Sequence, residues 1–393
     1  MVIAFGKAPT LGFGKQGSPR VSSPHQFSSH LKPDRQGAGW MGTPTRGIEL
    51  DRYFGGLFRS DARAFACVAT SPNDVPGWQN RARPALRHLI GLSVIETDSS
   101  GHVPRIDLGE PEAFDDYTRQ LGVIETEPGV HLPFWFLTPP GAGPFPLGIF
   151  PHGHEDHGMD TYVGKARDAA HQSRIDREDR DVAVQAVRRG LVAIAPNTRG
   201  FLPANVPDDR ERHGKRDCRC QAIHCLLAGR TAIGERVWDL SALIDWASGL
   251  PIVDSKRVLM MGNSGGGVAT LYAAACDARV TVAVPSCSYC SIVGLDGRVH
   301  HCDCNTVPGI LRFGEFWDVA GLIAPRALAI VNGNQDLLFP LAEVDRAVEE
   351  CARIFQVAGI PELFEHHYGD GGHRFYADLM WPFVARNLPC PAI

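Results

Sequence analysis

The spacing of hydrophobic positions changes along the chain and divides it into three regions. Over residues 1–45 Gly, Pro, Ser and basic residues dominate without periodicity, which predicts a flexible N-terminal arm. Over residues 46–100 apolar residues recur three or four positions apart, most clearly at 78–90, which predicts a helical N-terminal extension. Over residues 101–393 short apolar runs alternate with amphipathic segments, which predicts one large domain.

The large domain is predicted to be an α/β structure. Its expected strands are 105–108, 122–126, 131–137, 146–150, 191–195, 257–261, 280–284 and 326–331. Its expected helices are 181–189, 235–247, 341–357 and 375–387. Continuous apolar strands that alternate with amphipathic helices are typical of a doubly wound, mostly parallel sheet with helices on both faces.

One strand leads into a glycine-rich turn that contains a serine. The strand ends at Gly262, the turn reads Gly-Asn-Ser-Gly-Gly, and an alanine-rich segment follows. A Gly-X-Ser-X-Gly turn between a strand and a helix is the pattern of a nucleophile elbow. Ser264 is therefore the candidate nucleophile, and the Gly265 amide at the start of the helix is placed to stabilise an oxyanion.

Two further residues complete a candidate catalytic triad. Asp336 follows the strand at 326–331, and His373 lies in a glycine-rich loop before the last predicted helix. The order Ser, Asp, His along the chain is the α/β-hydrolase order, and a serine needs a histidine base oriented by a carboxylate. The alternatives were His366 and His367 for the base and Asp370 for the acid.

Composition and charge indicate which partners and which compartment the protein has. The chain of 393 residues is 44% hydrophobic and 21% charged, with a formal net charge of −5, so neither nucleic acid nor a membrane surface is expected as a partner. The first seven residues form too short an apolar run for a signal peptide, and no stretch has the length of a membrane span. Eleven cysteines leave at least one unpaired within the monomer. We therefore expect a cytoplasmic protein.

Residues from about 100 to 390 resemble an α/β-hydrolase of the dienelactone hydrolase and acetyl xylan esterase or cephalosporin C deacetylase type. The segments that carry the resemblance are 151–154 (Pro-His-Gly-His), 197–200 (Asn-Thr-Arg-Gly), 262–266, 324–328 (Ala-Pro-Arg-Ala-Leu) and 372–373 (Gly-His). A further stretch, 300–315, is similar to a subset described broadly as acetyl xylan esterase-like, which the helical extension also fits.

The resemblance assigns roles around the serine. It implies that the backbone amide of His154, or of its neighbour Gly153, is the second oxyanion donor beside Gly265. Those relatives carry Gln after the nucleophile where this chain has Gly265, so the acetyl preference does not follow. We expect His152, Gly153 and Arg199 to contact substrate, although Arg199 also suits a structural salt bridge. The long insert 285–323 is expected to cap the active site within the catalytic domain 101–393.

Metal chemistry is the sharpest alternative. His152, His154, Asp156 and His157 satisfy the His-X-His-X-Asp-His pattern of metallo-hydrolases, which hold one or two zinc ions. A second candidate is the cluster of Cys287, Cys290, Cys302 and Cys304, with Cys218, Cys220 and Cys225 upstream. This cluster suits free thiols, one disulfide or a structural zinc site. Free thiols or one local bridge are preferred, and no metal is expected.

The sequence thus predicts a serine hydrolase that cleaves carboxylic esters through an acyl-enzyme. The expected substrate is a small-molecule or carbohydrate ester, no cofactor is required, and the sequence leaves a homo-oligomer open. A serine amidase or peptidase on the same fold is an alternative, as is a binding protein that has kept the fold without activity.

Overall fold

The computed structural model describes residue 53 and residues 63–201, 217–295 and 297–389. The arm predicted at 1–45 lies outside these residues. The described residues belong to one compact unit that contains the whole sheet.

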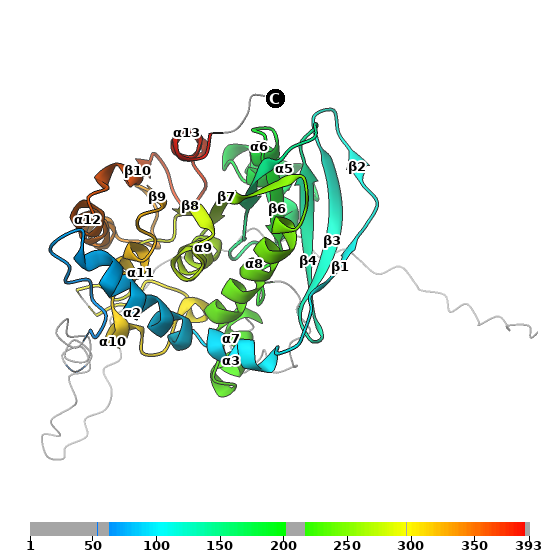
Figure 1. Ribbon diagram of the computed structural model, residues 1–393. Coiled ribbons are helices and arrows are strands. Elements are labelled where there is room, and N and C mark those ends of the chain that lie inside the picture. Colours follow the sequence, from blue (N-terminus) through cyan, green and yellow to red (C-terminus); the bar gives the residue numbers. More distant parts are fainter. Residues whose placement is uncertain (1–52, 54–62, 202–216, 296, 390–393) are drawn as a thin grey trace, which may run out of the picture. The chain divides into compact units, whose positions relative to one another are not determined.

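A ten-stranded sheet forms the centre of this unit (Figure 1). Its strands are β1 (Arg105–Leu108), β2 (Glu112–Ala113), β3 (Thr118–Glu127), β4 (Val130–Thr138), β5 (Phe145–Ile149), β6 (Val192–Pro196), β7 (Val253–Asn263), β8 (Val280–Ser286), β9 (Ala327–Gly333) and β10 (Phe364–Gly369). They are arranged in the order β1-β3-β4-β6-β5-β7-β8-β9-β10, with β2 paired to β3.

The direction of the strands follows their sequence pattern. Neighbouring strands from β6 to β10 along this order run parallel. The pairs β1–β3, β3–β4 and β4–β6 are antiparallel. All positions of β5, β6 and β9 are buried, while β3 alternates between buried and exposed positions. A strand covered on both faces needs apolar residues throughout, which confirms the predicted doubly wound, mostly parallel sheet.

Helices cover both faces of the sheet (Figure 1). One face packs against α8 (Ala232–Ser248), α9 (Gly265–Cys276) and α12 (Leu341–Val357), and the other packs against α6 (Val182–Val187) and α13 (Ala377–Asn387). Shorter helices are α3 (Leu92–Asp98), α4 (Met159–Tyr162), α5 (Ala169–Arg177), α7 (Asp217–Leu227), α10 (Ile310–Phe313) and α11 (Phe316–Gly321), with 3₁₀ turns η3 (Asp303–Asn305) and η4 (Pro361–Leu363). Alternate strand residues supply the two cores: Val258 and Met260 face one, and Leu259 and Met261 face the other.

Helix α2 (Asp74–Leu89) lies where the sequence predicts a helical extension. It packs on the face of α9 and α11, and its Leu86 is fully buried. The Gln79 amide donates to the carbonyl of Ala324 at 2.6 Å, and the Arg83 guanidinium donates to the carbonyl of Ala275 at 2.9 Å. These bonds satisfy carbonyl groups at the ends of two helical segments, so α2 is part of the same core as the sheet.

No helix in the described ranges has both the length and the apolar character that a membrane span requires.

Candidate active site

Ser264 occupies the turn between β7 and α9 and has a strained backbone. Its φ of 58° and ψ of −126° are rare for a residue with a side chain and cost about 1–3 kcal/mol. A Cβ atom on Gly262 would lie 2.5 Å from the Gly266 carbonyl oxygen, and one on Gly266 would overlap the carbonyl of Pro151. Both glycines are therefore needed for the close approach, and the turn has the form of a nucleophile elbow.

Asp336 and His373 lie together at the same edge of the sheet. Strands β9 and β10 run parallel with Gly333 paired to Gly369, so the loops that follow them leave the sheet side by side. The Asp336 carboxylate accepts a hydrogen bond from Nδ1 of His373 at 2.7 Å, and its other oxygen accepts the Leu338 amide at 3.0 Å. Because Nδ1 donates, the Nε2 atom of neutral His373 is left as a proton acceptor.

The serine turn and the histidine loop are joined through Ser286 at the end of β8. The Ser264 amide donates to the Ser286 carbonyl at 2.9 Å, and the Ser286 hydroxyl donates to the Arg374 carbonyl at 3.3 Å. Neither the Ser264 hydroxyl nor Nε2 of His373 has a hydrogen-bond partner among the described residues. In resting enzymes such catalytic hydrogen bonds are often long and shorten when substrate binds.

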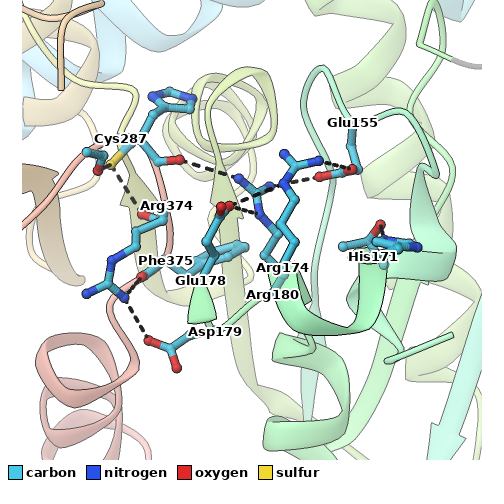
Figure 2. A network of polar contacts seen from close by, with 12 residues as sticks. Glu155, His171, Arg174, Glu178, Asp179, Arg180, Cys287, Arg374 and Phe375 are labelled. Carbon is cyan, nitrogen blue, oxygen red and sulfur yellow. Dashed lines mark hydrogen bonds and ion pairs between the residues drawn. The ribbon is translucent and has the colours of Figure 1, made fainter. Parts of the chain in front are cut away.

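An ion-pair network behind the site was not found from the sequence (Figure 2). The buried Arg180 guanidinium contacts Glu155 at 2.8 Å and Glu178 at 2.6 Å, and it also donates to the His373 carbonyl at 3.4 Å. Burial alone would lower the pKa of Arg180, but the two carboxylates outweigh it and raise the pKa, so the group stays charged. Arg180 thus connects the loop after β5 to the histidine loop.

The loop after β5 passes directly over the serine turn. A Cβ atom on Gly153 would lie 2.7 Å from the Gly265 amide nitrogen and 3.0 Å from Cβ of Ser264. The amides of Gly265 and His154 donate no hydrogen bond within the described part of the chain. Free amides beside a candidate nucleophile are what an oxyanion hole requires.

His152 and Arg199, which we expected to contact substrate, have structural partners. His152 is fully buried; its Nδ1 donates to the Gly153 carbonyl at 2.9 Å and its Nε2 accepts the Thr198 amide at 3.0 Å. Burial lowers the pKa of His152, so the ring stays neutral. Arg199 lies 2.6 Å from Asp239 and pairs with further carboxylates around it. This geometry gives both residues structural partners, and their contact with substrate stays a prediction.

The His-X-His-X-Asp-His motif does not assemble as a metal site. His152 faces the Thr198 amide, the ring of His154 faces Cys218, and the ring of His157 packs on His171 with centroids 3.9 Å apart. Among the described residues, the potential ligand atoms of this motif are not grouped within 4.8 Å of one another. The metallo-hydrolase alternative is therefore not supported by the geometry.

The cysteines that the sequence grouped together are in separate places. Cys287 lies beside Asp336 and His373, and Cys290 contacts His301 at 3.7 Å, whereas Cys302 and Cys304 face the ring of His154. Burial raises the pKa of the Cys287 thiol to about 12, so it remains protonated at neutral pH. None of these four cysteines forms a disulfide bond.

The insert 285–323 lines most of a cavity of about 320 Å³. The cavity is lined by Tyr272 of α9 and by residues between 292 and 316, most of them apolar. His301 lines it and packs on Phe339 with ring centroids 5.6 Å apart, and Phe339 in turn stacks on His373 at 6.1 Å. The insert therefore reaches the histidine through two aromatic contacts.

The order of the strands and the serine turn define the α/β-hydrolase fold, as the resemblance implied. The fold is similar to that of a Bacteroides fragilis NCTC 9343 protein named as an acetyl xylan esterase, with a TM-score of 0.67, 15% identity and coverage of 87% of this chain and 95% of that one. The methylesterase BT1017 gives a TM-score of 0.60 at 20% identity, over 79% of this chain and 64% of that one. The glucuronoyl esterase of Solibacter usitatus gives a TM-score of 0.55 at 15% identity, over 76% of this chain and 88% of that one.

The comparison of sequences alone gives a match to part of one curated protein. The chain is 25% identical over 151 residues to a Bacillus subtilis (strain 168) protein named as a hydrolase, YtaP, and the match spans 38% of this chain and half of that protein. No family model matches the sequence.

Proposed function

We propose that the protein is a serine hydrolase that cleaves carboxylic esters through an acyl-enzyme. The observation that carries the proposal is the hydrogen bond between His373 and Asp336 at the sheet edge where the strained Ser264 turn lies. This arrangement combines a nucleophile, a base with a free nitrogen and a carboxylate that orients the base. The three fold neighbours described above are all named as esterases, which supports the same class of reaction.

In the proposed mechanism Ser264 attacks the ester carbonyl while Nε2 of His373 takes its proton. Asp336 stabilises the imidazolium that forms, and the amides of Gly265 and His154 hold the negative charge on the carbonyl oxygen. His373 then returns the proton to the leaving alcohol, which leaves the acyl group on Ser264. A water molecule, deprotonated by His373, releases the acid and restores the serine.

We propose that the substrate is a carbohydrate or small-molecule ester, one part of which enters the cavity under the insert. The acetyl xylan and glucuronoyl esters in the names of the fold neighbours are carbohydrate esters. The cavity of about 320 Å³ has mostly apolar walls, which suit a compact apolar group. Its lining residue His301 contacts Phe339, and Phe339 contacts His373, so the cavity lies near the proposed base.

The test is hydrolysis of p-nitrophenyl acetate and p-nitrophenyl butyrate by wild type and Ser264→Ala. We expect kcat to fall by about 10⁴-fold or more in the variant, because removal of the nucleophile disables the whole triad. Ser255→Ala is the matched control, since Ser255 is exposed on the same strand β7. Equal kcat in wild type and Ser264→Ala would contradict the proposal.

A further inference from the structure

Three thiols and one imidazole converge beside the loop that passes over the serine. Nε2 of His154 lies 3.2 Å from Sγ of Cys218, 3.5 Å from Sγ of Cys302 and 3.8 Å from Sγ of Cys304. All four atoms lie within 4.8 Å of one another. His154 lies in the loop after β5 and Cys218 in helix α7, whereas Cys304 lies in the turn η3 and Cys302 directly precedes it. These three segments are distant in sequence.

The spacing of the four atoms fits one tetrahedral ion. Zinc binds cysteine sulfur at about 2.3 Å and histidine nitrogen at about 2.0–2.1 Å, so a tetrahedral site places nitrogen and sulfur about 3.6 Å apart. The three distances from His154 lie on both sides of that value. A disulfide needs two sulfurs about 2.05 Å apart, and all three cysteines are free.

The charge around the cluster also fits a bound ion with three thiolates. Arg236 is 1% exposed, its Nη1 lies 3.4 Å from the Cys304 carbonyl, and its Nη2 has no hydrogen-bond partner among the described residues. Its guanidinium stacks on Phe201 at 4.3 Å, and Phe201 packs on the ring of His154 with centroids 4.4 Å apart. Arg236 also donates to Asn305 Oδ1 at 3.0 Å and to the Arg199 carbonyl at 3.2 Å, but no carboxylate of the described chain forms an ion pair with it. A buried cation without an opposite charge nearby is costly. A divalent ion with three thiolates carries one net negative charge, which would offset the positive charge of Arg236.

We propose that His154, Cys218, Cys302 and Cys304 bind one zinc ion. Thiolate and imidazole ligands favour zinc over magnesium or calcium, and four protein ligands leave no open position, so the ion is structural rather than catalytic. The ion joins the loop after β5 to the insert through η3 and to helix α7. The site rests on this geometry and not on the proposed ester hydrolysis.

The experiment measures the zinc content of the purified full-length chain by inductively coupled plasma mass spectrometry. We expect about one zinc per chain in wild type and at least a fivefold loss in Cys218→Ser. Cys225→Ser is the matched control and keeps its zinc, because Cys225 lies on the same helix and is equally buried at 4% exposure but belongs to no ligand group.

Further variants keep the test decisive if Cys218→Ser does not fold. The partly exposed Cys302→Ser should lose zinc, because it removes one of the four ligands. Cobalt(II) added to the metal-free protein should give the visible bands of a tetrahedral thiolate site, weakened in Cys302→Ser. The Ser264→Ala variant should bind zinc as wild type does, so a failed esterase assay leaves this result unaffected.

Three outcomes would overturn the proposal. The first is that wild type is purified without zinc and also fails to bind added zinc or cobalt. The second is that Cys302→Ser keeps zinc at the wild-type stoichiometry. The third is that mass spectrometry of unreduced peptides finds a disulfide among Cys218, Cys302 and Cys304.

Discussion

Gly153 lies where the loop after β5 crosses the serine turn, and the two backbones leave no room for a side chain. A Cβ atom there would lie 2.8 Å from the Asn263 carbonyl oxygen as well as 2.7 Å from the Gly265 nitrogen. Such contacts are shorter than real Cβ atoms show, so one of the two segments has to move. The amides that we assign to the oxyanion hole belong to these two segments.

We therefore expect Gly153→Ala to lower kcat for p-nitrophenyl acetate by about 10²-fold, because a shift of about 1 Å in catalytic geometry has that effect. The free energy of unfolding should fall by only about 1–3 kcal/mol, as for other overpacked sites. Gly77→Ala is the control, since a Cβ atom on Gly77 meets nothing within 4 Å. An unchanged kcat in Gly153→Ala would show that this loop is not part of the site.

The residues that sequence reasoning could reach are those with a local signature. Ser264 has its glycine turn, and the positions of Asp336 and His373 after strands follow from the chain order. The contact of Arg180 with Glu155 and that of Cys218 with His154 join segments without any shared local pattern. Only the folded backbone brings such pairs together.

Among the elements, helix α2 shows how the N-terminal extension and the sheet share one core. The Leu86 side chain is fully buried in the same cluster as residues of α9 and α11. The extension therefore contributes to the stability of the domain that carries the candidate site.

Leu86→Ala should lower the free energy of unfolding by about 2–5 kcal/mol, because it removes a buried side chain and leaves a cavity. Urea unfolding followed by tryptophan fluorescence and by far-ultraviolet circular dichroism measures the change. The exposed Arg81→Ala on the same helix should cost under about 0.5 kcal/mol. A separate early transition for α2, instead of one shifted transition, would contradict a shared core.

Most elements with a clear period could be predicted, whereas several helices outside the regular alternation could not. The helix at 341–357 and the strand at 105–108 have the predicted bounds, and the other predicted strands overlap those observed. Helices α4 and α10 escaped prediction, because four residues are too few for a helical period. Helix α11 lies in the insert 285–323 and was not predicted either. Helix α7 was also missed, and its cysteines were considered only as possible ligands.

For the molecule as a whole, the buried His152 and the half-buried His301 link stability to pH. Burial, together with the neighbouring His300, lowers the pKa of His301 from 6.5 to about 4, and burial also lowers the pKa of His152. As the pH falls from 6.5 toward 4, the unfolded chain binds these protons before the folded protein does. The folded state is therefore fully favoured above pH 6.5 and loses stability through this window.

The matching prediction is that the free energy of unfolding of wild type falls between pH 6.5 and 4.5 and that His301→Phe reduces this fall. His301 contributes at most about 3 kcal/mol to this fall in the free energy of unfolding. Phenylalanine preserves the aromatic contacts to Phe316 and Phe339 without a titrating group. The exposed His131→Gln should keep the wild-type dependence. An identical pH dependence in His301→Phe and wild type would contradict this assignment.

The central claim is that Ser264 is the nucleophile, and covalent trapping tests it most directly. Wild type is incubated with diisopropyl fluorophosphate, and intact mass spectrometry with peptide mapping measures the adduct. We expect one adduct per chain on Ser264, complete loss of esterase activity and no adduct on Ser264→Ala. An adduct on another residue, or activity that persists in the fully labelled protein, would contradict the claim.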